Sequence, residues 1–356
     1  MKINIDASSI RSTAAFCTAW RINMIAKEIG ERGIIEIIRE RLELPEEMVT
    51  PFGEDVSALD IGEGRLLALK ADMLVGSTDI PPLMNYFQAA RKAIVMNVSD
   101  FASKGMTPKA FMVSLGLPPE LGRDEIEQLS LGLNSGAREY RTHLVGGDTG
   151  MARDLVIAVS GYGIGERSTL ILRSGARPGD FLATTGEFGD TAAGLRALLE
   201  GVELPRQLKT RLQRKVLMPQ ARLDEGLAIA KMRAATASID SSDGLAFSVH
   251  ELSRMSRVGF TITKPPVSRN ARRFAEITKC DPLDLALYGG EEYELVMTIR
   301  PDMWKKAKRL IPSLLKIGVA TEEREVVAEY NHRTITVEPR GWEHFKSEAE
   351  WSGRRP

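Results

Sequence analysis

Strand-like and helix-like hydrophobic patterns alternate in the first half of the chain, and this order constrains the fold more than any other feature of the sequence. Residues 65–75 form a nearly continuous apolar run, which predicts a mostly buried strand. From Phe87 to Phe101, apolar residues recur every three or four positions, as they do on one face of a helix. Residues 109–117 and 155–159 predict further strands, with a second helical pattern between them. The order strand, helix, strand, helix, strand predicts helices layered on a sheet.

The second half of the chain repeats this style with different strands and helices. Between them, residues 163–179 are rich in Gly, Arg, Ser and Pro, which is typical of a linker. We therefore expect an α+β fold with two α/β-layered domains, each a sheet with helices. The predicted organisation is an N-terminal domain at 24–165 and a C-terminal domain at 166–356. Regular helical spacing begins only at Met24, so residues 1–23 are expected to be a weakly ordered extension.

Charge and composition exclude several classes of function. Lys and Arg together balance Asp and Glu at 48 each, so no overall positive field favours nucleic acid or an anionic membrane. No apolar run reaches the ~20 residues that cross a bilayer. The cysteines, Cys17 and Cys280, are far apart and the four histidines are not closely paired, which argues against disulfides and zinc. A small-molecule partner and a reducing cytoplasm are expected.

Acidic residues at predicted strand ends and turns indicate phosphate chemistry. The sequence contains neither a Walker-type phosphate loop nor protein-kinase motifs. Carboxylate oxygens are the ligands that Mg²⁺ takes alongside substrate phosphates. The candidate carboxylates are Glu54, Asp55, Asp72, Asp100, Asp148, Asp240 and Asp243.

Most of these carboxylates, taken singly, also have a structural interpretation. Asp55 and the segment 146–149 (Gly-Gly-Asp-Thr) are compatible with ordinary turns, and Asp100 with a solvated helix position. The segment 241–244 (Ser-Ser-Asp-Gly) precedes a helical pattern and is equally compatible with an N-cap. Asp72 is the exception, because an unpaired carboxylate within an apolar strand costs several kcal/mol unless a cation or hydrogen-bond donors compensate it.

Two further segments can each be interpreted as solvated surface or as part of a binding site. Arg173 and Arg177 lie in the predicted linker, either as solvated charges or as guanidinium groups that bind a phosphate where two domains meet. Glu291 and Glu292 follow two glycines and precede a strand, either in a solvated turn or as acceptors for a cationic or amino-bearing substrate.

Seven motifs in order resemble the thiamine-monophosphate kinase family, from about residue 27 to residue 346. They are Gly-Glu-Asp at 53–55, Ala-Asp-Met-Leu at 71–74, Asn-Val-Ser-Asp at 97–100, Gly-Gly-Asp-Thr at 146–149, Arg-Ser-Gly-Ala-Arg-Pro-Gly-Asp at 173–180, Asp-Ser-Ser-Asp-Gly at 240–244 and Gly-Gly-Glu-Glu-Tyr-Glu-Leu at 289–295. Seven motifs in register are far more specific than any one of them.

The resemblance implies a superfamily shared with aminoimidazole ribonucleotide synthetase and selenophosphate synthetase. It implies a homodimer whose N-terminal sheets pair, with ATP and several Mg²⁺ ions in a cleft. The reaction implied is direct transfer of the γ-phosphoryl group of ATP to thiamine monophosphate. No general base is assigned, because a phosphate-monoester acceptor is already largely ionised near neutral pH.

The resemblance also implies roles for individual residues. The metal ligands would be Asp55, Ala71, Asp72, Asp100, Asp148, Asp240 and Asp243. ATP would contact Gly147, Asp148, Arg173 and Ser242. The substrate would contact Asp79, Glu291 and Trp342, and the last two would meet its thiamine end.

Two of these positions depart from the usual family pattern. Ala71 replaces a threonine hydroxyl near one metal, where a backbone carbonyl could still serve. Asp79 replaces a substrate-facing histidine of bacterial members, and an acid there is compatible with the positive thiazolium of thiamine. The segment 76–85 is more similar to archaeal relatives.

Two alternatives stay open on sequence. One is another ATP-using enzyme of the same superfamily, similar to aminoimidazole ribonucleotide synthetase. The other is a nucleotide-binding regulator without catalysis, which the departures at Ala71 and Asp79 leave open. Selenophosphate synthetase is disfavoured because Cys17 lacks a Gly-rich setting, and a hydrogenase-maturation dehydratase because the chain does not end in a cysteine.

Overall fold

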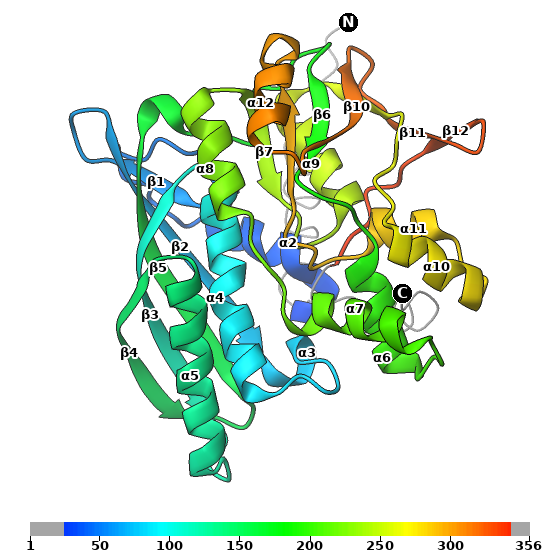
Figure 1. Cartoon of the computed structure of the whole chain (residues 1–356). Coiled ribbons are helices and arrows are strands. Elements are labelled where there is room, and N and C mark those ends of the chain that lie inside the picture. Colours follow the sequence, from blue (N-terminus) through cyan, green and yellow to red (C-terminus); the bar gives the residue numbers. More distant parts are fainter. Residues whose placement is uncertain (1–24, 343–356) are drawn as a thin grey trace, which may run out of the picture. The chain divides into compact units, whose positions relative to one another are not determined.

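A computed structural model describes residues 25–342 (Figure 1). The predicted extension at 1–23 and the last residues of the predicted C-terminal domain lie outside the described residues. Helix α2 (Ala26–Arg39) belongs to one compact unit, and residues 45–342 belong to another. Both sheets and every predicted site residue lie in the second unit, which is described below.

The first sheet has five strands in the order β1-β2-β5-β3-β4. Its pairings are antiparallel except for the parallel pair of β3 and β4. The strands are β1 (Ser57–Asp60), β2 (Arg65–Val75), β3 (Thr107–Leu117), β4 (His143–Met151) and β5 (Val156–Glu166).

Helices α4 (Tyr86–Ser103) and α5 (Arg123–Glu139) cover one face of this sheet (Figure 1). Along β2, Leu66, Ala68 and Leu74 point to the helices and are buried. Leu69 and Met73 point to the opposite face and are exposed. The prediction of a mostly buried strand at 65–75 was therefore wrong, because the alternation typical of an antiparallel sheet applies here.

The second sheet has seven strands in the order β12-β11-β8-β10-β6-β9-β7, and only β8 and β11 pair in parallel. Its strands are β6 (Phe181–Thr184), β7 (Ala235–Asp240), β8 (Gly259–Ile262), β9 (Leu295–Ile299), β10 (Leu315–Thr321), β11 (Val326–Tyr330) and β12 (Arg333–Thr336). The accompanying helices are α6 (Asp190–Glu200), α7 (Arg206–Leu217), α8 (Leu223–Met232), α9 (Leu245–Ser256), α10 (Arg269–Thr278), α11 (Pro282–Tyr288) and α12 (Trp304–Leu310). Short turns of helix also occur at α3 (Gly76–Asp79), η1 (Arg167–Thr169) and η2 (Pro301–Met303).

Helix α4 connects the two sheets. It packs on β2 and β5 of the first sheet and also contacts α8, β7 and β9 from the second half. One continuous hydrophobic core includes Phe101 on α4, Ile157 on β5 and Leu295 on β9. Polar groups that the chain places on the C-terminal half of α4 can therefore meet groups from both sheets.

Three local expectations were wrong. The segment 146–149 lies inside strand β4 and is not a turn, because its residues pair with β3. The segment 241–244 does not cap helix α9 through a side chain: the N-cap is Gly244, with φ 108°. The predicted linker at 163–179 begins later, because β5 continues to Glu166. Among residues 25–342, no helix combines the length and apolar character that a membrane span requires.

Candidate active site

Three buried aspartates from distant parts of the chain meet beside helix α4. Asp55 lies in the loop before β1, Asp100 in α4, and Asp240 at the end of β7. One carboxylate oxygen of each lies within 4.8 Å of the others, and the three residues are 3%, 6% and 5% exposed. The loop before β1, helix α4 and strand β7 thus contribute one carboxylate each.

Three basic side chains partly neutralise this cluster. Lys70 Nζ lies 2.9 Å from Asp100 Oδ2 and 3.0 Å from Asp72 Oδ1. Lys104, fully buried at the end of α4, lies 2.7 Å from Glu54 Oε2 and 3.1 Å from Asp55 Oδ2, and donates to the Ser238 carbonyl. Arg173 Nε donates to Asp55 Oδ1 over 2.9 Å. Glu54 in turn accepts the backbone N–H of Arg173.

The pKa values of the three aspartates are shifted in different directions, because the basic side chains compensate them unequally. Burial would raise the pKa of Asp55, but the charges of Arg173 and Lys104 outweigh it and hold that pKa below its usual value. Burial raises the pKa of Asp240 to about 7, with a further contribution from Asp55. Burial also raises the pKa of Asp100 well above normal, although Lys70 opposes this and Asp240 adds to it. Lys70 is thus the one cation paired with Asp100, and no ion pair among residues 25–342 involves Asp240, so burial outweighs the nearby positive charge at both carboxyl groups.

Asp72 is not the unpaired buried carboxylate that the sequence indicated. Its side chain is 29% exposed and pairs with Lys70, which lies two residues earlier on the same strand face. The hydrophobic pattern of residues 65–75 does not reveal this ion pair, because Lys70 is a single charged residue within a mostly apolar run. Lys70 joins Asp72 to Asp100, so Asp72 borders the cluster through a shared cation.

Among residues 25–342, no hydrogen bond or ion pair joins Ala71, Gly147 or Asp148 to the aspartate cluster. Ala71 follows the period-two alternation, so its side chain is on the face of β2 opposite Asp72. The strand register places Gly147 beside Val113, Val113 beside Val159, and Val159 beside Asp72. These three strand spacings put Gly147 roughly 14 Å from Asp72. Asp148 is exposed on the edge strand β4.

The other predicted residues gather around the loop between α11 and β9. The Glu291 backbone N–H donates to the Ser242 carbonyl over 2.7 Å, and that of Trp342 to the Asp243 carbonyl over 3.0 Å. The Glu291 side chain forms an ion pair with Lys92 of α4. Lys92 also donates to the carbonyl of Asp79 over 3.0 Å, which brings the predicted substrate residues Asp79 and Glu291 to one lysine.

Sequence reasoning missed the residues that position these carboxylates. Ser99 donates to Asp240 over 2.8 Å, and Ser103 donates to Asp55. Ser99 and Ser103 are one helical turn apart, and Asp100 lies between them. This spacing in the sequence could have indicated a polar stripe on α4. The carboxylate partners of Lys92 and Lys104 are more than 40 positions away in the sequence, so no local pattern predicts these ion pairs.

Comparisons with known proteins match most of the length of this chain. A family profile described as AIR synthase related protein, N-terminal domain, matches residues 53–166. The thiamine-monophosphate kinase of Nitrosopumilus maritimus is 33% identical over 323 residues, which cover 90% of this chain and 99% of the relative. That of Pyrococcus horikoshii is 36% identical, over 83% of this chain and 91% of the relative.

The chain belongs to the thiamine-monophosphate kinase family. A solved structure of AaThiL complexed with AMPPCP and TMP aligns with a TM-score of 0.80 at 31% identity, covering 90% of this chain and 99% of that one. The hydrogenase maturation protein HypE of E. coli aligns with a TM-score of 0.65 at 21% identity, which shows a shared fold alone. Family membership and the two-sheet α+β fold are thus confirmed, and the chain is a thiamine-phosphate kinase.

Proposed function

We propose that the chain transfers the γ-phosphoryl group of ATP directly to the phosphate of thiamine monophosphate, in line and with several Mg²⁺ ions. A bond forms between an oxygen of the acceptor phosphate and the γ-phosphorus, and the bond from that phosphorus to the bridging oxygen of ADP breaks. The products are thiamine diphosphate and ADP. The observation that carries the proposal is the buried cluster of Asp55, Asp100 and Asp240 in a chain of this family.

The cluster fits a divalent cation. Its three oxygens lie close enough to share one ion, and burial raises the pKa of Asp100 and Asp240 although Lys70 pairs with Asp100, so a further positive charge would stabilise both carboxylates. Asp55, Asp100 and Asp240 would hold one Mg²⁺, and Asp72 and Asp243 would hold others near by. Bound Mg²⁺ would offset the repulsion between carboxylates and phosphates and stabilise charge on the transferring group. Asp148 and the Ala71 carbonyl are the remaining proposed ligands.

Arg173 is the proposed ATP-phosphate contact among the described basic residues. Its side chain is 18% exposed, and Asp55 fixes the guanidinium at the cluster through Nε and a second nitrogen. The remaining donors of the fork suit phosphate oxygens. Ser242 and Gly147 would contact ATP as well.

The substrate end is proposed to lie at the loop that carries Glu291. This side chain is 34% exposed and meets Lys92, whose ammonium group orients it. Asp79 accepts the Val75 backbone N–H over 2.7 Å, so its carboxylate is held at the end of β2. Trp342 would stack on the thiamine end. An acceptor phosphate is already ionised, so the chain needs to align the two substrates and requires no general base.

The homodimer is also a proposal. The face of the first sheet that α4 and α5 leave uncovered carries exposed apolar side chains from adjacent strands, which are Leu69, Met73, Met112 and Tyr162. An exposed apolar patch on a sheet is typical of a protein interface. A second copy of the chain is the occupant that we propose for this face.

Phosphorus NMR of the purified protein with ATP, Mg²⁺ and thiamine monophosphate tests the reaction. We expect thiamine diphosphate and ADP to form in equal amounts, and chelation of the metal to stop both. ATP loss without thiamine diphosphate would indicate another substrate of the superfamily. Binding without turnover would indicate a regulator, and either result would overturn the proposed reaction.

A further inference from the structure

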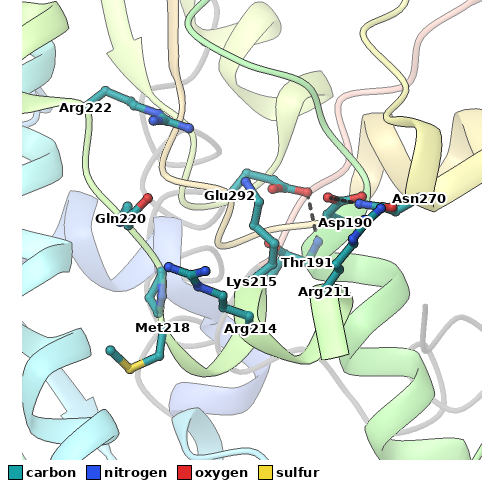
Figure 2. Close-up of a pocket in the computed structure, with 11 residues that line it drawn as sticks. Asp190, Thr191, Arg211, Arg214, Lys215, Met218, Gln220, Arg222, Asn270 and Glu292 are labelled. Carbon is teal, nitrogen blue, oxygen red and sulfur yellow. Dashed lines mark hydrogen bonds between the residues drawn. The ribbon is translucent and has the colours of Figure 1, made fainter. Parts of the chain in front are cut away.

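A pocket of about 370 Å³ lies in the second half of the chain, apart from the aspartate cluster. It is enclosed by the start of α6, helix α7, residues 218–222 and the side chain of Glu292 (Figure 2). None of the residues assigned above to metal, ATP or thiamine monophosphate lines it. The proposed reaction therefore leaves this pocket without a role.

Two buried polar groups in this pocket lack a partner within residues 25–342. Glu292 Oε1 accepts the backbone N–H groups of Gly189 and Thr191, over 2.7 and 3.0 Å. Glu292 Oε2 and Thr191 Oγ1 have no hydrogen-bond partner in this part of the chain, although the two residues are only 5% and 3% exposed. Leaving a buried polar group unsatisfied is unfavourable, because the group loses its hydrogen bonds to water and gains none in return. A ligand with polar groups at this end of the pocket would satisfy both.

The opposite wall carries basic residues. Arg211, Arg214 and Lys215 are three and four residues apart on α7, so they share one helix face and point toward the pocket (Figure 2). No ion pair or hydrogen bond within residues 25–342 engages their side chains. Arg222 differs, because its guanidinium binds Glu294 over 2.5 and 2.8 Å.

Asp190, one of the two acidic residues that line the pocket, already has hydrogen-bond partners. Asp190 accepts hydrogen bonds from Ser268 and, over 3.1 Å, from Asn270. Arg211, Arg214 and Lys215 therefore face two carboxylates: Asp190, which is already hydrogen-bonded, and Glu292, whose pKa burial raises to about 7 although the charge of Lys215 opposes this. The charge balance favours an anion. The volume exceeds that of a phosphate group alone and suits a small organic molecule.

We propose that this pocket is a second ligand site, which binds a small phosphate monoester. The phosphate would lie against Arg211, Arg214 and Lys215, and hydroxyl groups at the other end would bind Glu292 Oε2 and Thr191 Oγ1. Glu292 is adjacent to Glu291, and the loop that holds both connects the pocket to the proposed substrate contact at Lys92. Occupancy would therefore alter the KM for thiamine monophosphate, an effect that rests on the proposed function.

Calorimetric titration tests the phosphate end with inorganic sulfate, in EDTA and at constant ionic strength. Sulfate keeps its charge across neutral pH, so the probe does not titrate. We expect R211Q/R214Q to weaken sulfate binding at least tenfold. The matched control is R206Q/K209Q, which removes two exposed charges from the same helix outside the pocket and should change binding less than threefold. No binding to the wild type, or equal losses in the two variants, would overturn the proposal.

The inner end is tested with glycerol 3-phosphate, which adds two hydroxyl groups to the anion. Thr191→Val keeps the side-chain shape and removes the hydroxyl. It should weaken glycerol 3-phosphate several-fold while leaving sulfate unchanged. Equal affinity of wild type and Thr191→Val for glycerol 3-phosphate would refute the inner contacts. These binding measurements need no turnover, so their failure is distinguishable from failure of the proposed kinase reaction.

Discussion

At the residue scale, the chemistry of the site depends on carboxylates that are compensated to different extents. Asp55 has two cations and a hydroxyl donor, whereas Asp240 has Ser99 and only distant positive charge. Asp72 shares Lys70 with Asp100 at the border of the cluster. Local sequence patterns identified each of these aspartates. The positive charges and donors around each one, which those patterns do not show, determine how far its negative charge is compensated.

Asp72→Asn should reduce kcat at least a hundredfold while the protein stays folded. The change removes a proposed metal ligand, whereas the lost ion pair with Lys70 is partly exposed and contributes about 1 kcal/mol or less. Thiamine diphosphate formation and the urea unfolding midpoint would be measured together. Asp224→Asn removes an exposed ion pair with Arg141 and is the control. Near-normal turnover would exclude Asp72 from the metal ligands.

Glu292 should make the folded chain less stable as pH rises from about 5 to 8. Burial raises its folded-state pKa from 4.5 to about 7, partly opposed by Lys215, while nearby Asp190 and Glu294 add to the rise. The folded state thus binds more protons than the unfolded state within this window, so stability is lost as the proton leaves. Glu292→Gln replaces this carboxyl group with an amide, which does not titrate between pH 5 and 8.

The measurement is the free energy of unfolding in urea at pH 5 and pH 8. We expect the wild type to lose roughly 1–3 kcal/mol more than Glu292→Gln between the two values. Other titrating groups are common to the two proteins and cancel in the comparison. Parallel pH profiles would contradict the raised pKa.

At the element scale, helix α4 holds the site together. It is buried against both sheets, and its C-terminal half supplies Ser99, Asp100, Ser103 and Lys104. Lys104 binds Glu54 and Asp55 before β1, and the Ser238 carbonyl of β7. One side chain therefore links the segment that carries Asp55 to the strand that ends at Asp240.

Lys104→Ala should destabilise the chain by about 3–5 kcal/mol, because it leaves the buried carboxylates of Glu54 and Asp55 without one of their cations. Thermal and urea unfolding would measure the loss. Lys109→Ala on β3 removes an exposed lysine and should change stability by less than about 0.5 kcal/mol. Equal effects of the two substitutions would show that Lys104 has no special role in the cluster.

At the scale of the whole molecule, the two sheets differ in how much of their surface is exposed. The first sheet packs helices on one face and leaves the other apolar and exposed, whereas the strands β6, β7 and β9 of the second sheet are largely buried. The predicted domain boundary near residue 165 and the cytoplasmic location stay predictions. The proposed homodimer would form through the uncovered face of the first sheet.

Met73→Glu with Met112→Glu should convert a dimer into a monomer. These side chains lie on the uncovered face, and each charge would have to be buried without a partner in an interface. Sedimentation velocity would measure the mass. Leu310→Glu changes an equally exposed residue of α12 and should leave the dimer unchanged. A wild type that sediments as a monomer at micromolar concentration would refute the dimer.

The sequence by itself determined the fold class, the family and the list of acidic residues. These depend on periodicity and on short motifs, which are local properties of the chain. Only the tertiary structure decided that Asp55, Asp100 and Asp240 meet, that Lys70 of β2 pairs with Asp100 of α4, and that Glu292 faces a basic pocket. Burial, ion pairing and charge balance arise from contacts between segments that lie far apart in the chain, and no local pattern records them.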